Sequence, residues 1–204
     1  MACKARRHRW RSLQCGIATS IPAFPQRPAA RGVHRCKLRC MDLVTHFQML
    51  AKYNRIANER LFATCALLDD AEYRQRRAGS FGSIHGLLNH LLLGDRRWMA
   101  LFERGDRATP PLNRILYDDL SSLRSARARE DLRIESFFGG LDAAFWDRSF
   151  AYTNNQGQDY IETAHVACCH LFNHQTHHRA QVHVMLSQTS TPPPALDLHR
   201  ILNP

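Results

Sequence analysis

Five of the chain's twelve histidines lie in one stretch, residues 170–183, HLFNHQTHHRAQVH. Imidazole is the commonest protein ligand of divalent metals, and it also exchanges protons near neutral pH. His174 and His178 are four residues apart. On a helix their side chains therefore project from one face, one turn apart, at a spacing that lets two imidazoles bind one ion. If this stretch is helical, it predicts a metal site.

The apolar pattern of the stretch selects this pair among the five histidines. One predicted helix face is apolar except for two positions, and it consists of Ala167, Leu171, His174, His178, Val182 and Met185. His177 and His183 lie off this face, so we expect them to be exposed or partly exposed. His170 with His174 is an alternative pair. All three cannot bind one ion, because His170 and His178 are about 12 Å apart along a helix axis. The pattern favours His174 and His178, with His170 as a neighbour of the pocket.

A third ligand is available upstream, in the segment LLNHLLLGD. His90 lies on an apolar line with Leu87, Gly94 and Leu101. Burying a histidine without a partner costs free energy, so three inward-facing histidines need an explanation. Metal ligation supplies one. The alternative is three core histidines that form hydrogen bonds with the backbone or with carboxylates.

Other catalytic motifs are missing from the sequence. Gln175 stands where a zinc protease of the H-E-x-x-H type has glutamate, so that mechanism is unsupported. There is no glycine-rich phosphate loop and no serine nucleophile elbow. After residue 40 only Cys65, Cys168 and Cys169 remain, and three cysteines do not suggest a disulfide framework.

The histidines must be positioned by helices, because apolar residues recur at spacings of three and four from residue 41 onward. Asp42 is the expected N-cap of the first helix, and Ser80 or Ser83 that of the second. The four predicted helices cover residues 41–68, 83–105, 118–141 and 161–188, the second ending by Gly105 and the third at Gly139 and Gly140. Four long amphipathic helices predict an all-α, four-helix bundle, in which metal sites are built by facing helices.

The connecting segments are expected to be mostly irregular. Residues 69–79 form a polar break, and residues 146–160 suggest a small hairpin or ordered loop in a long connection before the last helix. The proline-rich tail, residues 189–204, is expected to be non-helical. We expect it to pack across the bundle through Leu196, Leu198 and Leu202.

The formal charge of +10 comes entirely from residues 1–40, which contain ten basic residues and no acidic ones. The remaining 18 basic residues balance the 18 acidic residues of the chain, so residues 41–204 are neutral and do not favour nucleic-acid binding. The basic leader is a transit-like segment, a functional basic tail or, as we favour, an upstream extension before a true start at Met41. We expect two parts, a disordered leader over 1–40 and a folded domain over 41–204.

Three segments in order carry a resemblance to a known family: MLAKYNRIANERL, SIHGLLNHLLLGDRRW and HLFNHQTHHRAQVH. Together they resemble the DinB/YfiT-like superfamily of DNA-damage-inducible, metal-binding four-helix bundles, over residues 41–204. The family's ligand triad is one histidine on the second helix and an H-x3-H pair on the last. These positions match His90, His174 and His178.

The resemblance implies a metal-dependent enzyme that acts on a small molecule, by thiol S-transfer or hydrolysis. Three imidazoles leave coordination positions open, and nitrogen ligands suit Zn²⁺ or Ni²⁺, with Fe²⁺ or Mn²⁺ as alternatives. The implied partners are a small-molecule substrate, such as a low-molecular-weight thiol, and a second copy of the chain in a homodimer. No apolar run is long enough to span a membrane, so no membrane span is expected. We also expect a cytoplasmic protein. The rival functions are a non-catalytic metal-binding stress-response bundle and a nucleic-acid binder that uses the leader.

Four further residues have two interpretations each. Asp95 and Arg179 lie near the predicted ligands and either orient the imidazoles or form an interhelical ion pair, which we favour. Tyr53 and Asn54 either line the pocket or form hydrogen bonds between helices in the core.

Overall fold

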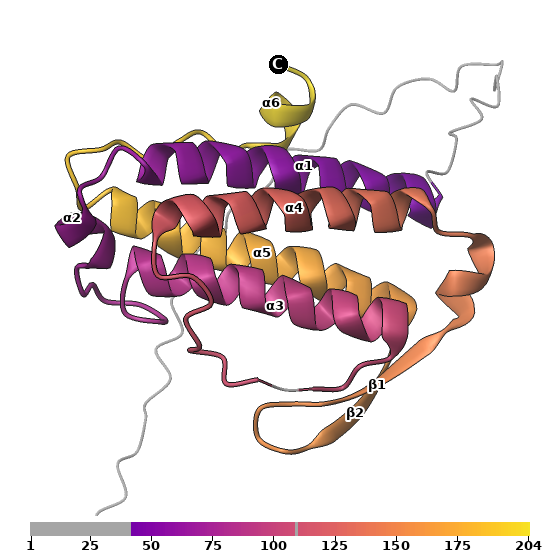
Figure 1. Cartoon of the computed structure of the whole chain (residues 1–204). Helices are drawn as coiled ribbons and strands as arrows, with labels where there is room; N and C mark the ends of the chain where they lie inside the picture. Colours follow the sequence, from indigo (N-terminus) through magenta and orange to yellow (C-terminus); the bar gives the residue numbers. More distant parts are fainter. Residues whose placement is uncertain (1–41, 109) are drawn as a thin grey trace, which may run out of the picture. The chain divides into compact units, whose positions relative to one another are not determined.

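The computed structural model describes residues 42–108 and 110–204, and the predictions about residues 1–40 lie outside them. Within the described residues the protein is mostly helical, with one small two-stranded sheet (Figure 1). Its elements are α1 (Leu43–Cys65), α2 (Asp70–Arg74), α3 (Ile84–Arg104), α4 (Leu120–Gly139), the 3-10 helix η1 (Ala143–Asp147), β1 (Ser149–Thr153), β2 (Asp159–Thr163), α5 (Ala164–Leu186) and α6 (Leu198–Leu202).

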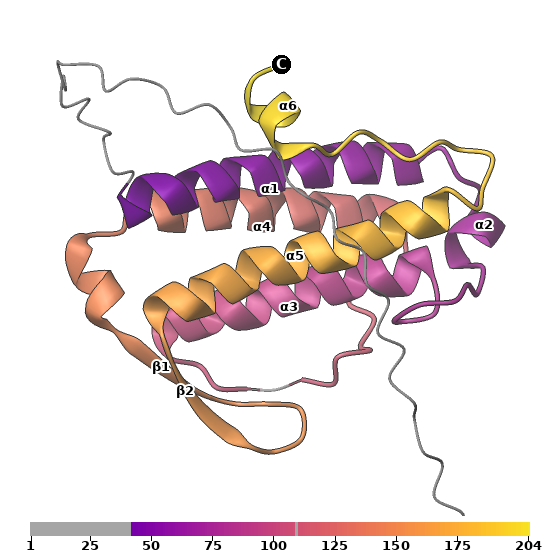
Figure 2. The same cartoon turned by 180° about the vertical axis from the view of Figure 1, so that it is seen from behind.

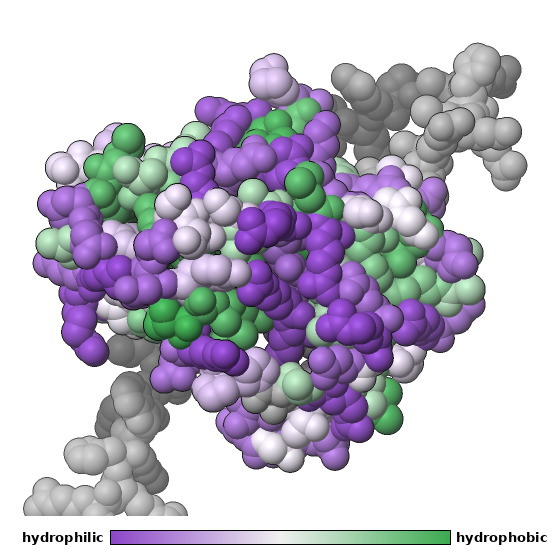
Figure 3. Space-filling view, in the orientation of Figure 1, coloured by the Kyte–Doolittle hydropathy of each residue, from purple (hydrophilic) through white to green (hydrophobic). Residues whose placement is uncertain are grey.

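The four long helices lie side by side. Helix α1 packs along α4 and α3 packs along α5, while α1 also contacts α5 and α3 also contacts α4 (Figures 1 and 2). The hairpin and the connection between α3 and α4 lie on the outer side of the α3–α5 pair (Figure 2). Hydrophilic residues dominate the middle of the face in Figure 3, where α4 meets solvent. None of the described helices combines the length and apolar character needed to cross a membrane.

The predicted starts of the first two long helices are confirmed. Asp42 and Ser83 each accept a hydrogen bond from the backbone N–H three residues further on, which satisfies a donor that the first turn leaves unpaired. Asp119 caps α4 in the same way. Helix α3 ends at Gly105, whose φ of 68° lies in the left-handed region that glycine adopts without strain.

The prediction that the last helix begins at Ile161 is wrong. Residues 159–163 form strand β2, which pairs with β1 in antiparallel register, Tyr152 opposite Tyr160. The two tyrosine rings stack with centroids 5.8 Å apart, a cross-strand contact that favours the hairpin over three more helical residues. Gly157, with φ of 78°, supplies the left-handed position in the turn. The hairpin therefore extends further than the sequence indicated.

Three short helices were also missed: α2, the 3-10 helix η1 and α6. Asp69 caps α2 within the polar break, and Arg74 pairs with Asp70 one turn earlier. The prediction that the tail is non-helical is wrong, because α6 forms after its prolines and contacts α1. There Ile201 is the buried residue, 5% exposed, whereas Leu198 is 37% exposed and Leu196 and Leu202 are half-buried. The tail packs against the helices as expected, but mainly through a different side chain.

The core consists of two apolar clusters separated by a buried polar layer. One cluster contains Phe47, Phe102 and Phe138, and the other contains Leu61, Leu88 and Leu123. In each long helix the residues of this polar layer fall between the two clusters in sequence. The polar layer is formed by Asn54, Asn58, Asp95, Arg127, Asp131, Gln175 and Arg179, all of them buried.

Candidate metal centre

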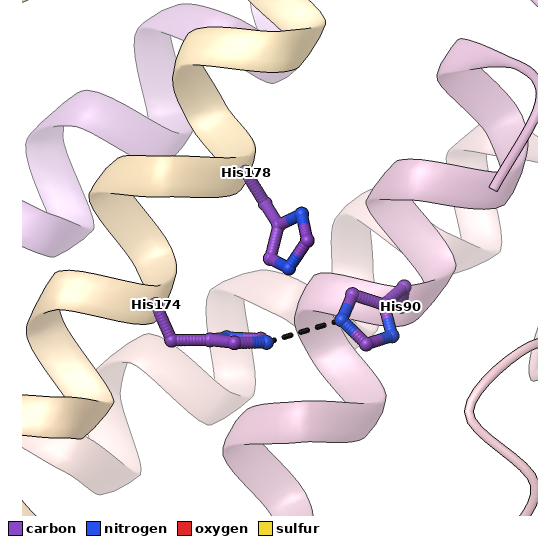
Figure 4. A group of neighbouring side chains, drawn as sticks. All are labelled: His90, His174 and His178. Atoms are coloured by element: carbon purple, nitrogen blue, oxygen red, sulfur yellow. Dashed lines mark hydrogen bonds between the residues drawn. The ribbon is translucent and has the colours of Figure 1, made fainter. Parts of the chain in front are cut away.

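Helices α3 and α5 bring the three predicted histidines together. His90 lies on α3, and His174 and His178 lie one turn apart on α5. Figure 4 shows the three rings turned toward one another. One ring nitrogen from each residue lies within 4.8 Å of the others, and the Nε2 atoms of His90 and His174 are 3.1 Å apart.

This spacing suits a small divalent ion. With metal–nitrogen bonds of about 2.0–2.1 Å and tetrahedral angles, two ligand nitrogens are separated by about 3.3 Å. The distance between His90 and His174 is close to this value, and the rings of His174 and His178 are 4.5 Å apart between centroids. The cluster therefore needs only small side-chain adjustments to hold an ion.

Burial keeps the three imidazoles neutral. His90 and His178 are 3% and 7% exposed, and His174 is half-buried. Desolvation, followed by the charges of the other histidines, lowers the pKa of His174 to about 3 and that of His178 to about 4. Desolvation also lowers the pKa of His90. At neutral pH each ring therefore offers a lone pair, which metal ligation requires.

The hydrogen bonds around the rings decide between a metal site and ordinary core histidines. His90 Nδ1 donates to the carbonyl oxygen of Leu112 at 3.0 Å, which leaves the Nε2 lone pair directed at the cluster. The buried Nδ1 atoms of His174 and His178 have no hydrogen-bond partner among the described residues. A core histidine held by the backbone or a carboxylate would have such a partner. Only His90 satisfies that alternative, so the donor set fits a metal better.

The position of the pair on α5 differs in detail from the predicted stripe. The centre of the buried face runs through Leu171, Gln175 and Arg179, and His174 and His178 lie at its edge, toward α3. The reason is that α5 packs against both α1 and α3, which widens its buried face. His177 is exposed and His183 half-buried, as predicted.

Gly94 makes room for the cluster. A Cβ atom at this position would lie 2.8 Å from His174 Cε1, closer than non-bonded carbon atoms approach. Only glycine allows the His174 ring to lie against α3 here. The sequence placed Gly94 on the same line as His90, but gave no sign of the ring that covers it.

The cluster opens into a cavity of about 480 Å³. Phe81 stacks on His90 with ring centroids 3.7 Å apart, and Leu112 approaches from the α3–α4 connection. His170 lines the cavity beside Trp98, at 4.9 Å between ring centroids, which confirms it as a neighbour of the pocket. The hairpin contributes residues 152, 154 and 155. Sequence reasoning missed Phe81, Trp98 and the hairpin, because only the fold brings them to the histidines.

Of the four residues with two interpretations, Asp95, Arg179 and Asn54 belong to the polar layer. Asp95 forms a buried ion pair with Arg127, with 2.7 Å between Oδ2 and Nη1. The predicted ion pair between Asp95 and Arg179 is therefore wrong. Arg127 bridges onward to Asp131 at 3.0 Å. Neither Asp95 nor Arg127 is among the residues that line the cavity of the cluster.

Arg179 is held by side-chain amides and not by a carboxylate. It donates to Asn54, Asn58 and Gln175. Tyr53 donates to the carbonyl oxygen of Leu196 at 2.8 Å and lies under the Arg179 guanidinium. Neither Tyr53 nor Asn54 lines the cavity. Asn54 forms hydrogen bonds between helices, with Asp131 and Arg179, as its second interpretation predicted, whereas the hydrogen bond of Tyr53 goes to the tail.

Fold and site together define a class: a helical protein in which two neighbouring helices present a three-histidine cluster to a cavity. The sequence model of the DinB family matches residues 42–204 of the chain. The protein therefore belongs to the DinB family, as its three motifs indicated. No curated protein shows significant similarity to it.

Proposed function

We propose that this protein is a metal-dependent enzyme that acts on a small molecule by thiol S-transfer or hydrolysis. In this proposal the long helices form the four-helix bundle of the family, and His90, His174 and His178 hold a divalent ion, Zn²⁺ or Ni²⁺ by preference. The observation that carries the proposal is the convergence of three neutral imidazoles at the wall of a cavity.

Two features favour catalysis over simple metal binding. Three protein ligands leave at least one coordination position open, whereas structural metal sites are closed by four. The open side of the cluster faces a cavity of about 480 Å³, within the range of small-molecule sites. A non-catalytic metal-binding bundle, the alternative function, would have no need of polar groups such as Arg97 and Asn155 in that cavity.

The chain's own residues would orient and shield the site. The Leu112 carbonyl fixes the ring of His90, and Gly94 admits the ring of His174. Phe81 covers the face of His90 and limits the access of water to it. A divalent ion held there would lower the pKa of a thiol or a water molecule and so supply a nucleophile at neutral pH. In S-transfer, the thiol loses its proton to solvent, its sulfur bonds to an electrophilic carbon, and the leaving group departs with the bonding electrons.

The thiol, the small-molecule substrate and the homodimer expected from the sequence stay proposals. The activity itself is tested with the full chain loaded with Zn²⁺ or Ni²⁺, 2-mercaptoethanol as thiol and 1-chloro-2,4-dinitrobenzene as electrophile, and 4-nitrophenyl acetate for hydrolysis. We expect turnover with at least one substrate, its loss on chelation, and its return when the metal is restored.

The matched control is His177→Ala, which removes an exposed neighbour of His178. It should retain the activity, and His90→Ala should abolish it. Equal rates for chelated protein, His90→Ala and metal-loaded wild type would contradict a metal-dependent reaction.

A further inference from the structure

The far end of the cavity contains a guanidinium group. Arg97 follows His90 by seven residues on α3, so both side chains leave the same face of the helix about 10 Å apart along its axis. Arg97 lines the cavity and is half-buried. The hairpin holds it in place, because Nη2 donates to the Thr153 carbonyl at 2.6 Å and Nη1 to Asn155 Oδ1 at 3.2 Å.

No carboxylate neutralises Arg97 among the described residues. It is absent from the ion pairs there, and its two hydrogen bonds go to neutral oxygens. The nearest basic neighbour, Arg96, by contrast, faces Glu130 at 3.7 Å. A guanidinium has five N–H groups, so three of those on Arg97 have no acceptor in the described part of the chain.

Among the described residues that line the cavity there is no aspartate or glutamate to offset Arg97. Burial lowers the pKa of the four histidines in the lining, so the positive charge of the wall comes from Arg97. A cavity whose wall has charge of one sign concentrates small ions of the opposite sign. Between the two ends the wall is apolar or aromatic, with Leu93, Trp98 and Tyr152. The cavity therefore has a metal-binding end, an apolar middle and a cationic end.

We propose that Arg97 is an anion-binding subsite, so that the substrate is an organic anion whose carboxylate or similar oxyanion pairs with Arg97 while its reactive group lies at the three histidines. The inference deepens the proposed function and rests on it for the second half of that statement. The first half, an anion on Arg97, depends only on the guanidinium and the hairpin. Planar guanidinium groups bind carboxylates through two parallel N–H donors, which gives both affinity and orientation.

The test compares two thiols that differ only at the far end, 6-mercaptohexanoate and 6-mercaptohexan-1-ol, titrated calorimetrically into the full-length chain loaded with Zn²⁺. We expect the carboxylate to bind roughly tenfold more tightly, the usual gain from one charge-assisted pair. In Arg97→Met this preference should fall to about one, with the affinity for the alcohol unchanged. Arg97→Lys, which keeps the charge but not the planar fork, should retain part of it.

The matched control is Arg104→Met, which removes an exposed arginine of the same helix that lies outside the cavity. It should leave the preference at the wild-type value. The proposal is overturned if wild type does not distinguish the two thiols, or if Arg97→Met keeps the full preference.

A second measurement covers the case in which Arg97→Met does not fold, and separates this inference from the metal. In metal-free wild type, hexanoate should shift the NMR signal of the Arg97 Nε–H group, and hexan-1-ol should not. A shift in a chain that binds no Zn²⁺ would support the anion subsite while the proposed function fails. An unmoved Arg97 signal in a chain that does bind Zn²⁺ would overturn the subsite alone.

Discussion

The histidine cluster and the polar layer are both buried, both polar and built from adjacent residues of the same helices. Gly94, His174 and His178 belong to the cluster, and their sequence neighbours Asp95, Gln175 and Arg179 belong to the layer. The charged groups of the layer have partners within it, because Asp95 and Asp131 pair with Arg127, and side-chain amides surround Arg179. The rings of the cluster lack such partners, because they face one another and a cavity.

The presence or absence of such partners distinguishes a buried polar group that stabilises the fold from one that can bind a ligand. A buried network whose opposite charges pair with one another is costly to break, because removing one partner leaves the other charge buried and uncompensated. A group of buried histidines whose nitrogens have no hydrogen-bond partner lowers the stability of the fold, unless a bound ion or ligand bonds to those nitrogens. Burial and polarity alone would not distinguish the two regions, whereas the identity of each side chain's partner does.

The largest effect should come from breaking the polar layer. Asp95→Ala leaves Arg127 buried with one carboxylate partner, and we expect the free energy of unfolding in urea to fall by about 3–5 kcal/mol. The folded fraction should still bind metal. Asp118→Ala, which removes an exposed partner of Arg74, is the control and should barely change stability. A similar loss in both variants would contradict the role of the layer.

Acid should destabilise the metal-free protein through the cluster. His174 and His178 have folded pKa values of about 3 and 4, well below the ordinary value of 6.5. The unfolded chain therefore takes up protons first, and stability is lost as the pH falls from about 6.5 toward 4. We expect a loss on the order of 2–3 kcal/mol from the two histidines together between pH 7 and pH 5.5, measured by urea denaturation. The double variant His174→Gln, His178→Gln should show a flatter profile, and an unchanged profile would contradict the neutral cluster.

Gly94→Ala should damage the cluster while sparing the layer. The added methyl group meets His174 and should weaken metal affinity by roughly 10–100-fold, the range for misplaced ligands. The free energy of unfolding should change little, because the gain in helix propensity from glycine to alanine, about 1 kcal/mol, offsets the cost of crowding His174. Gly139→Ala is the control, since its Cβ would meet no atom within 4 Å. Equal metal affinity in Gly94→Ala and wild type, determined by competition with a chelating dye, would rule out this positioning.

The smallest effect should come from the rim of the layer. Tyr53→Phe removes the hydrogen bond to Leu196 but keeps the ring under Arg179, so we expect a loss of about 1 kcal/mol in thermal or urea unfolding. Metal affinity should not change. A change in metal affinity would mean that the cluster and the layer are coupled, against the separation described above.

The sequence predicted the parts that follow from local pattern. The spacing of His174 and His178, the apolar line through His90, the caps Asp42 and Ser83 and the stop at Gly105 are properties of single helices. The cysteine count and the neutral net charge after residue 40 can likewise be read from the sequence without knowledge of the fold.

What the sequence could not predict depends on how elements meet. Asp95 on α3 pairs with Arg127 on α4, which is 32 positions further along the chain. Nothing in the local sequence distinguishes Arg127 from Arg179 as its partner. Arg97 reaches the cavity because the hairpin folds back onto α3, a contact between residues more than fifty positions apart. The start of α5 shifted to Ala164 because strand pairing competed with the helical pattern.

The central claim is that three histidines, and not their neighbours, form a metal site. The most direct measurement is the metal content of the purified full-length chain by plasma mass spectrometry, for wild type, His90→Ala, His178→Ala and the exposed control His177→Ala. We predict one divalent ion per chain in wild type and in His177→Ala, and a loss in the other two. A stoichiometric ion retained in both His90→Ala and His178→Ala would contradict the triad, as would a wild type that binds none and melts at the same temperature with a chelator.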